Sequence, residues 1–201
     1  MNMLRAPAWA LAGAAALLLS AGCGSAAPPR FHSLLGEPLR VAAPTLAWRL
    51  APVSVPAQVD QPQFVLRRAD GSLAVLEGER WQAPLQDELR DALSEQLGAR
   101  LGPAGQAAAA GRAEWRITLE VARFDSTPGR ATLVAQWQLQ SSRQRSGQRC
   151  SVRHEQAVAD GVPALAAGHR RNLAQLATAL AAALQELDAG LDTGQTRVCP
   201  A

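Results

Sequence analysis

The most regular pattern in this chain is an alternation of apolar and polar residues along two neighbouring stretches. The first, "AEWRITLEVARF" (residues 113–124), has an apolar side chain at nearly every second position, and "ATLVAQWQLQ" (131–140) repeats the pattern. Successive side chains of a β-strand point to opposite faces, so each stretch predicts a strand with one apolar face. The segment "DSTPGR" (125–130) is typical of the turn between them. We therefore expect an antiparallel hairpin with one covered face and one wet face.

Weaker alternation predicts further strands around this hairpin. The stretch "TLAWRLAPVSVP" (45–56) alternates until its prolines, and "QFVLRRADGSLAVLEGERW" (63–81) holds two apolar runs joined by Asp70-Gly71. An Asp-Gly pair between two such runs is a strong hairpin signal. Short strands are also expected at "RFHSLL" (30–35) and "RCSVRHEQAV" (149–158).

Two stretches have helical spacing instead. Between residues 85 and 101 a leucine recurs at every fourth position, acidic residues occupy the early turns, and Gly102-Pro103 follows. Residues 161–190 carry a longer stripe of leucine and alanine, and Gly190 is expected to end it. Both stretches therefore predict amphipathic helices.

These elements together predict an α+β fold. Two amphipathic helices and one mostly antiparallel sheet pack naturally as a two-layer sandwich, with both helices on the apolar face of the sheet. We expect residues 31–190 to form a single domain, which is long enough to bury a sizeable core.

The N-terminus is typical of a secretory signal peptide, expected here at residues 1–22. Arg5 precedes an uncharged apolar run of fourteen positions, Ala6 to Leu19, and Ser20, Ala21 and Gly22 are small. A membrane-spanning helix needs about 20 apolar residues, so this run is too short to remain as a permanent anchor.

The residue after this signal is Cys23, and the stretch resembles the lipobox of bacterial lipoproteins. The resemblance implies cleavage before Cys23 and acylation of its thiol, although Ser20 stands where the pattern prefers leucine. Two or more acyl chains hold a protein stably on a membrane. Gly24 in place of aspartate implies sorting to the outer membrane, facing the periplasm. The alternative is an ordinary cleaved signal followed by an incidental cysteine.

The segment after the cysteine is expected to be a short tether, residues 23–30. Its "GSAAPPR" portion is small, polar and rich in proline, and seven residues extend at most about 25 Å. The folded part of the protein is therefore expected to lie close to the membrane that holds Cys23.

Two cysteines remain, Cys150 and Cys199. In an oxidising compartment such a pair usually forms a disulfide, which would hold the C-terminal tail, residues 191–201, against the domain. The alternative is two buried, unpaired thiols. The net charge of +3 comes from arginine alone and is spread along the chain, so it does not indicate a nucleic-acid partner. The densest basic stretch, Arg143 to Arg149, is interpreted as a solvated hairpin tip rather than a phosphate or lipid-headgroup contact.

No catalytic, cofactor-binding or metal-binding constellation is present in the sequence, so we expect a protein that is not an enzyme. There is no G-x-S-x-G, H-E-x-x-H, C-x-x-C or glycine-rich phosphate loop. His169 is expected at the edge of a helix. A set of four carboxylates is expected on a solvated helix face: Asp87, Glu88, Asp91 and Glu95. Trp48, Trp115 and Trp137 are expected in the core. Trp81 is expected at the start of a helix, as a structural staple.

The middle of the chain resembles the PqiC/YmbA group of ABC-transport auxiliary lipoproteins over residues 30 to 190. The most specific pieces are Asp60-x-Pro62-Gln63 before an apolar strand, Arg80-Trp81-x-x-Pro84-Leu85 at a helix start, and the hairpin from Arg123-Phe124 to Trp137. Gln61 and Phe31-His32 depart from residues that are common in the group.

The resemblance implies a non-enzymatic outer-membrane lipoprotein without cofactor. Members accompany MCE-domain proteins, which are thought to carry lipids between bacterial membranes. The resemblance therefore implies docking onto an MCE-domain protein, linkage of that protein to the outer membrane, and several copies as a homo-oligomer. Two alternatives remain open: an envelope structural or assembly lipoprotein outside transport, and an envelope hydrolase.

Overall fold

The computed structural model describes residues 27–43, 45–105, 113–143 and 148–193, with side chains up to residue 190. The predicted signal peptide, Cys23, Cys199 and the end of the tail lie outside the described residues. The fold is α+β, as expected, with helices packed on mixed sheets. Among the described residues, no helix combines the length and the apolar character needed to cross a bilayer.

The larger sheet contains the predicted central hairpin. Its four strands lie in the order β2-β5-β6-β7. They are β2 (Ala47–Leu50), β5 (Glu114–Thr127), β6 (Arg130–Ser141) and β7 (Gln148–Ala157). Strands β5, β6 and β7 are antiparallel, whereas β2 pairs parallel to β5. The alternation is confirmed along β5, where Ile117 and Leu119 are at most 1% exposed and Thr118 and Glu120 between and after them are exposed.

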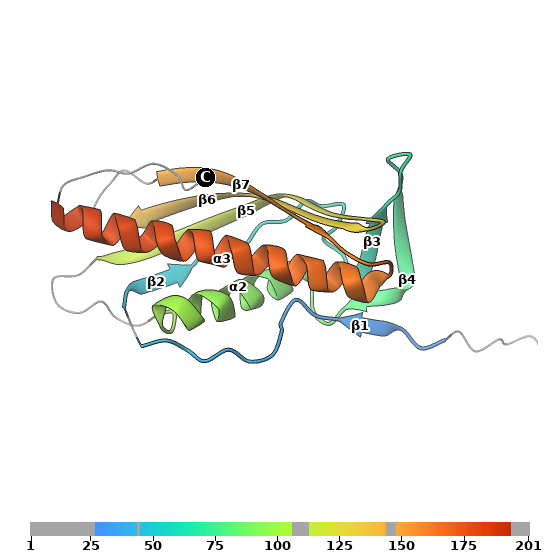
Figure 1. Ribbon diagram of the computed structural model, residues 1–201, viewed down its shortest axis with the longest axis horizontal. Coiled ribbons are helices and arrows are strands. Elements are labelled where there is room, and N and C mark those ends of the chain that lie inside the picture. The colour runs from blue at the N-terminus through green and yellow to red at the C-terminus, as the bar shows by residue number, and fades with distance from the viewer. Residues whose placement is uncertain (1–26, 44, 106–112, 144–147, 194–201) are drawn as a thin grey trace, which may run out of the picture.

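Both helices lie on one side of this sheet (Figure 1). Helix α2 (Leu85–Leu101) has the predicted bounds, and all five leucines of its stripe are fully buried. Helix α3 (Val162–Thr193) runs three residues beyond Gly190, so the expected end there is wrong. A glycine inside a helix costs only about 1 kcal/mol relative to alanine, and a long helix tolerates it.

Close packing holds α3 against the sheet at Gly168. A β-carbon there would lie 2.6 Å from Val158 Cγ1 and 2.9 Å from the β-carbon of Ala131. Only a residue without a side chain lets the two layers approach this closely.

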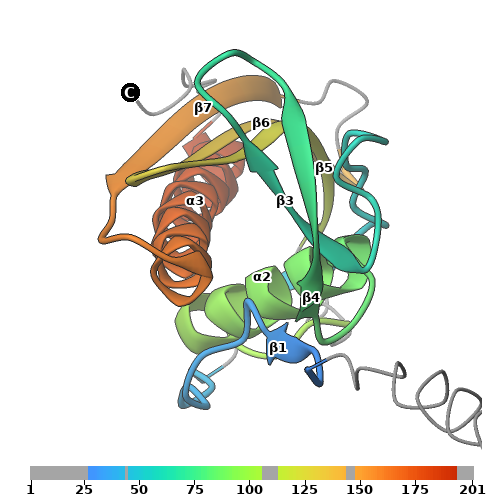
Figure 2. The ribbon, with the colours of Figure 1, turned by 90° about the vertical axis from the view of Figure 1, so that its right-hand side faces the viewer.

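The remaining strands form a second sheet rather than extending the first, so the expectation of one sheet is wrong. It has three strands in the order β1-β4-β3: β1 (Arg30–His32), β4 (Leu73–Trp81) and β3 (Gln63–Arg67). The Asp70-Gly71 hairpin is confirmed, with Gly71 at φ 85° and hydrogen bonds from Ser72 to the Asp70 carboxylate. This hairpin crosses one end of the molecule (Figure 2). There Trp81 packs between Phe64 of its own sheet and Phe124 of the larger sheet.

The predicted strand over residues 45–56 is much shorter in the structure. Only Ala47–Leu50 is a strand, and Pro52 and Pro56 lack the N–H groups needed to continue the ladder. The chain nevertheless follows β5 further, with an isolated bridge between Ser54 and Glu120.

The expected core positions of the tryptophans are confirmed. Trp48, Trp115 and Trp137 are at most 3% exposed on the side of the sheet that faces the helices. Trp81 is 3% exposed and belongs to β4, just before α2 begins.

Candidate functional site

Several elements of the fold contact the N-terminal segment of residues 30–43, which we call the strap. It begins as β1 and then runs along α2 on the side away from the four-stranded sheet (Figures 1 and 2). Its contacts move along α2 in the same direction as the helix. Ala42 N–H donates to the carbonyl of Gly98 (3.1 Å), and Thr45 N–H, just beyond the strap, donates to that of Leu101 (3.0 Å).

The start of the strap is held by a buried carboxylate on β4. Glu79 is 7% exposed and pairs with two side chains of β1, Arg30 and His32. The His32 Nε2 atom lies 2.5 Å from Glu79 Oε2. Parallel pairing of β1 with β4 places Arg30 opposite Glu79 in register, which brings these groups together.

The middle of the strap is held by carboxylates of α2. One of them is Glu88, for which the expected position on a solvated helix face is wrong. This side chain belongs to a residue only 3% exposed, and its Oε2 accepts hydrogen bonds from Ser33 Oγ (2.8 Å) and Leu34 N–H (2.6 Å). Glu95 Oε1 accepts another from Leu39 N–H (3.0 Å). The carboxylates thus replace water as partners of the strap backbone.

Sequence reasoning missed this role, although a signal was present. Glu88 and Glu95 are seven residues apart, close to two helical turns, so they lie on one face of α2. That face borders the leucine stripe, and Glu88 follows Leu85 by three positions on the same side.

The strap also contacts the second helix. Arg170 Nη1 of α3 donates to the carbonyl of Ser33 (3.0 Å), and Gln82 N–H donates to that of His32 (2.8 Å). Side chains or backbone of β4, α2 and α3 therefore all fix the first residues of the strap. This makes the strap a part of the folded body rather than a loose leader.

A second polar group lies in the core and resembles a nucleophile beside a base. Ser126 Oγ is 2.9 Å from His169 Nε2, and both residues are at most 2% exposed. The His169 ring stacks on Phe124 at 3.8 Å, so the expected helix-edge position is wrong. Burial lowers the pKa of His169 to about 3 and keeps the ring neutral. The position could have been inferred, because His169 continues the stripe of Leu165 and Leu173.

The neighbouring acid does not complete a catalytic arrangement. The Asp125 carboxylate is bound by Arg67 of β3 (3.0 Å) and by Arg123, and it joins the two sheets. Because Ser126 is enclosed in the core, this cluster is a structural contact between α3, β5 and the β3 hairpin. Within the described parts of the chain, no group of three metal-ligating side chains gathers.

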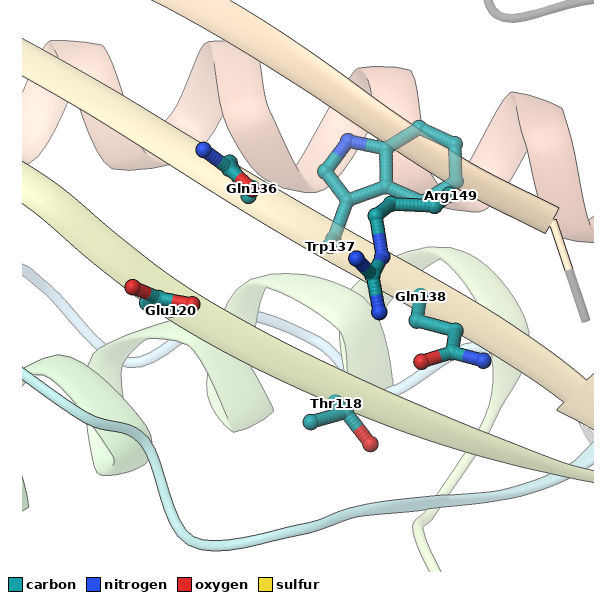
Figure 3. A pocket seen from close by; sticks show the side chains of 6 residues that line it. All are labelled: Thr118, Glu120, Gln136, Trp137, Gln138 and Arg149. Carbon is teal, nitrogen blue, oxygen red and sulfur yellow. The ribbon is translucent and has the colours of Figure 1, made fainter.

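The outer face of the larger sheet carries a shallow polar hollow of about 100 Å³ (Figure 3). Thr118, Glu120, Gln136, Gln138 and Arg149 line it on the side away from the helices, whereas the Trp137 indole points to the other side. Pockets for small molecules are usually about 300–1,000 Å³ and mostly apolar. This hollow has neither property.

The predicted disulfide can be placed only at one end. Cys150 lies on β7, 4% exposed and opposite Trp137 in the ladder, and Cys199 is outside the described residues. The pairing stays a prediction. The basic hairpin tip also lies partly outside the described residues, since the structure leaves out 144–147.

Comparison with known proteins gives one family. Residues 36–181 match the model of a family described as "ABC-type transport auxiliary lipoprotein component". No curated protein matches the chain.

Two solved structures share the fold. Protein XCC0632 from Xanthomonas campestris has a TM-score of 0.62 and 21% identity, and the match covers 83% of this chain and 99% of that one. A crystal structure described only as an uncharacterized protein has a TM-score of 0.62 and 18% identity, with 78% and 98% covered.

Proposed function

Because this chain belongs to the ABC-type transport auxiliary lipoprotein component family, we propose that it is a non-enzymatic lipoprotein subunit of an intermembrane lipid transporter of the MCE type. In this proposal Cys23 carries the acyl chains and holds the protein on the periplasmic face of the outer membrane. The folded body docks onto an MCE-domain protein, in several copies, and links it to that membrane.

The family match is the observation that carries this proposal. The matched region begins at residue 36, inside the strap and thirteen positions after Cys23. The strap is therefore the part of the folded body that follows the proposed anchor in the chain.

The way the strap is fastened supports a linking role. A force that pulls on Cys23 passes through the strap to Glu79, Glu88 and Arg170, which lie on three different elements. A partner that binds the body is thereby connected to the strap, which continues along the chain to Cys23. The first described strand begins only seven residues after the cysteine, so the link is short.

The anchor is tested by Cys23→Ser in the full chain, produced in a bacterium with a lipoprotein pathway. We expect the variant to lose metabolic palmitate label and to leave the membrane fraction. The neighbouring substitution Ser20→Ala, which keeps a small residue, is the matched control and should retain both. Membrane association of the Cys23→Ser variant, together with no palmitate on the original, would contradict the anchor.

The partner is tested by crosslinking the lipidated protein in membranes and purifying it. We expect an MCE-domain protein among the crosslinked products and copies of this chain linked to one another. Recovery of envelope proteins other than an MCE-domain protein would instead favour the structural or assembly role.

A further inference from the structure

The exposed apolar side chains of this protein are concentrated on the strap. Among the described residues six large apolar side chains are exposed, and four of them fall within the eleven residues from Phe31 to Val41. They are Phe31 (62%), Leu35 (41%), Leu39 (39%) and Val41 (61%). Single exposed apolar residues are ordinary on a protein surface, but a cluster of them marks an interaction surface.

The structure holds these side chains outward. Arg30 and His32 both bind Glu79, and side chains alternate along a strand, so Phe31 between them lies on the opposite face of the three-stranded sheet, where it is 62% exposed. The Leu39 amide is bound to Glu95, which fixes the backbone that carries its side chain. Apart from the buried Leu34, the strap is therefore attached through polar contacts, and its four exposed apolar side chains are left open to the surroundings.

The position of this apolar surface in the chain indicates which partner it contacts. Phe31 is only eight positions after Cys23, which is at most about 28 Å of extended chain. The surface is thus the first part of the folded body after the proposed anchor. Its exposed charges are Arg30, which pairs with Glu79, and Glu37 and Arg40, which offset each other, so we take the contact to be apolar rather than electrostatic.

We propose that the outer side of the strap rests on the phospholipid surface that holds the anchor, with Phe31, Leu35, Leu39 and Val41 at the boundary between headgroups and acyl chains. This inference depends on the proposed acylation of Cys23. The acyl chains confine the body to the bilayer, and the strap sets its orientation. The β3–β4 hairpin, with the other two exposed apolar residues, then points away from the lipid.

The test places a fluorescent reporter on the strap of the full, lipidated chain. Phe31→Trp and Leu39→Trp are reconstituted into phosphatidylethanolamine and phosphatidylglycerol vesicles, with and without lipid brominated near the headgroup end of its acyl chains. Trp48, Trp81, Trp115 and Trp137 are buried and give the constant background measured on the unaltered protein. Val75→Trp is the matched control, because Val75 is 43% exposed and lies four ladder positions from the β1 contact.

An interfacial side chain lies about 5–10 Å into the boundary region, within contact of the bromines, so we expect roughly half or more of the added emission to be lost on the strap. Val75→Trp should lose none. Raising the salt concentration should leave the quenching on the strap unchanged.

Flotation of the vesicles separates the two ways in which the proposal can fail. If the protein does not float with the vesicles and Cys23 carries no acyl mass, the proposed anchor fails and this inference falls with it. If the protein floats and the strap reporters are not quenched, the anchor stands and the lipid contact is overturned. Strap reporters that are unquenched by brominated lipid and also shielded from aqueous acrylamide would show that protein covers this surface, which overturns it too.

Discussion

Removal of the Glu88 carboxylate tests whether the strap is fastened as the structure indicates. Glu88→Ala deletes two hydrogen bonds to a charged acceptor, and bonds of this kind contribute about 1.5–3 kcal/mol each. Leu34 is 3% exposed, so its N–H finds no water as a replacement, whereas the partly exposed Ser33 hydroxyl can turn to solvent. We expect the free energy of unfolding to fall by about 2–4 kcal/mol.

Two further variants isolate the cause. Glu88→Gln keeps one acceptor oxygen but loses the charge and has an NH₂ group in place of the other oxygen, so its cost should be about 1 kcal/mol. Asp91→Ala removes a carboxylate of the same helix whose side chain is 51% exposed and which pairs with exposed Arg90, so the change should stay within about 0.5 kcal/mol.

The assay is urea unfolding followed by tryptophan fluorescence, with the midpoint and slope fitted separately. A change in midpoint at constant slope reports stability. The reasoning is refuted if Glu88→Ala unfolds at the same urea midpoint as Asp91→Ala, because the Glu88 carboxylate would then contribute nothing to the stability of the strap.

Three other predictions rest on separate parts of the fold. Gly168→Ala should lower the free energy of unfolding by about 1–3 kcal/mol, because the added β-carbon clashes with Val158. At Gly98 an added β-carbon meets nothing within 4 Å, so Gly98→Ala should raise the free energy of unfolding by about 0.5–1 kcal/mol. Equal shifts of the urea midpoint in the two variants would contradict the close approach of α3 to the sheet at Gly168. Burial lowers the pKa of His169 to about 3, so between pH 3 and 6.5 the unfolded chain binds more protons than the folded protein. The free energy of unfolding should therefore be highest above about pH 6.5 and should fall by about 3 kcal/mol by pH 4.5. In His169→Gln this fall should be weaker. A pH profile of His169→Gln parallel to that of the unaltered protein would remove histidine as the cause. Protein recovered from the envelope should contain a Cys150–Cys199 peptide in a non-reducing digest, and reduction should cost up to about 4 kcal/mol; two titratable thiols in the oxidised sample would show that the bond is absent.

Local patterns predicted the elements of this fold because their causes are local. The alternation of period two in β5 and β6 reports which side of each strand faces the helices, and Pro128-Gly129 lies at the turn that joins them. The leucine stripe of α2 likewise follows from helical geometry alone.

The division into two sheets had no local signal. Arg30 pairs with Glu79, 49 positions away, and Ala47 pairs parallel to Glu114, 67 positions away. Pairing over such distances depends on which edges are left open after the hairpins form. A stretch of three or four residues, as in β1 and β2, carries too little pattern to select its partner.

The strap was hidden from pattern reasoning for a related reason. Beyond β1, its backbone is bound by carboxylates and carbonyls of α2 rather than by a ladder, so its residues follow neither a period of two nor one of 3.6. Except for Leu34, the large apolar side chains of the strap do not attach it to the body. They therefore remain exposed. A segment that packed by burying Phe31 and Val41 would be hidden within the body. A segment held by Glu79, Glu88 and Glu95 can present those side chains to a surface outside it, and this division between polar attachment and apolar display is the physical basis of the proposed lipid contact.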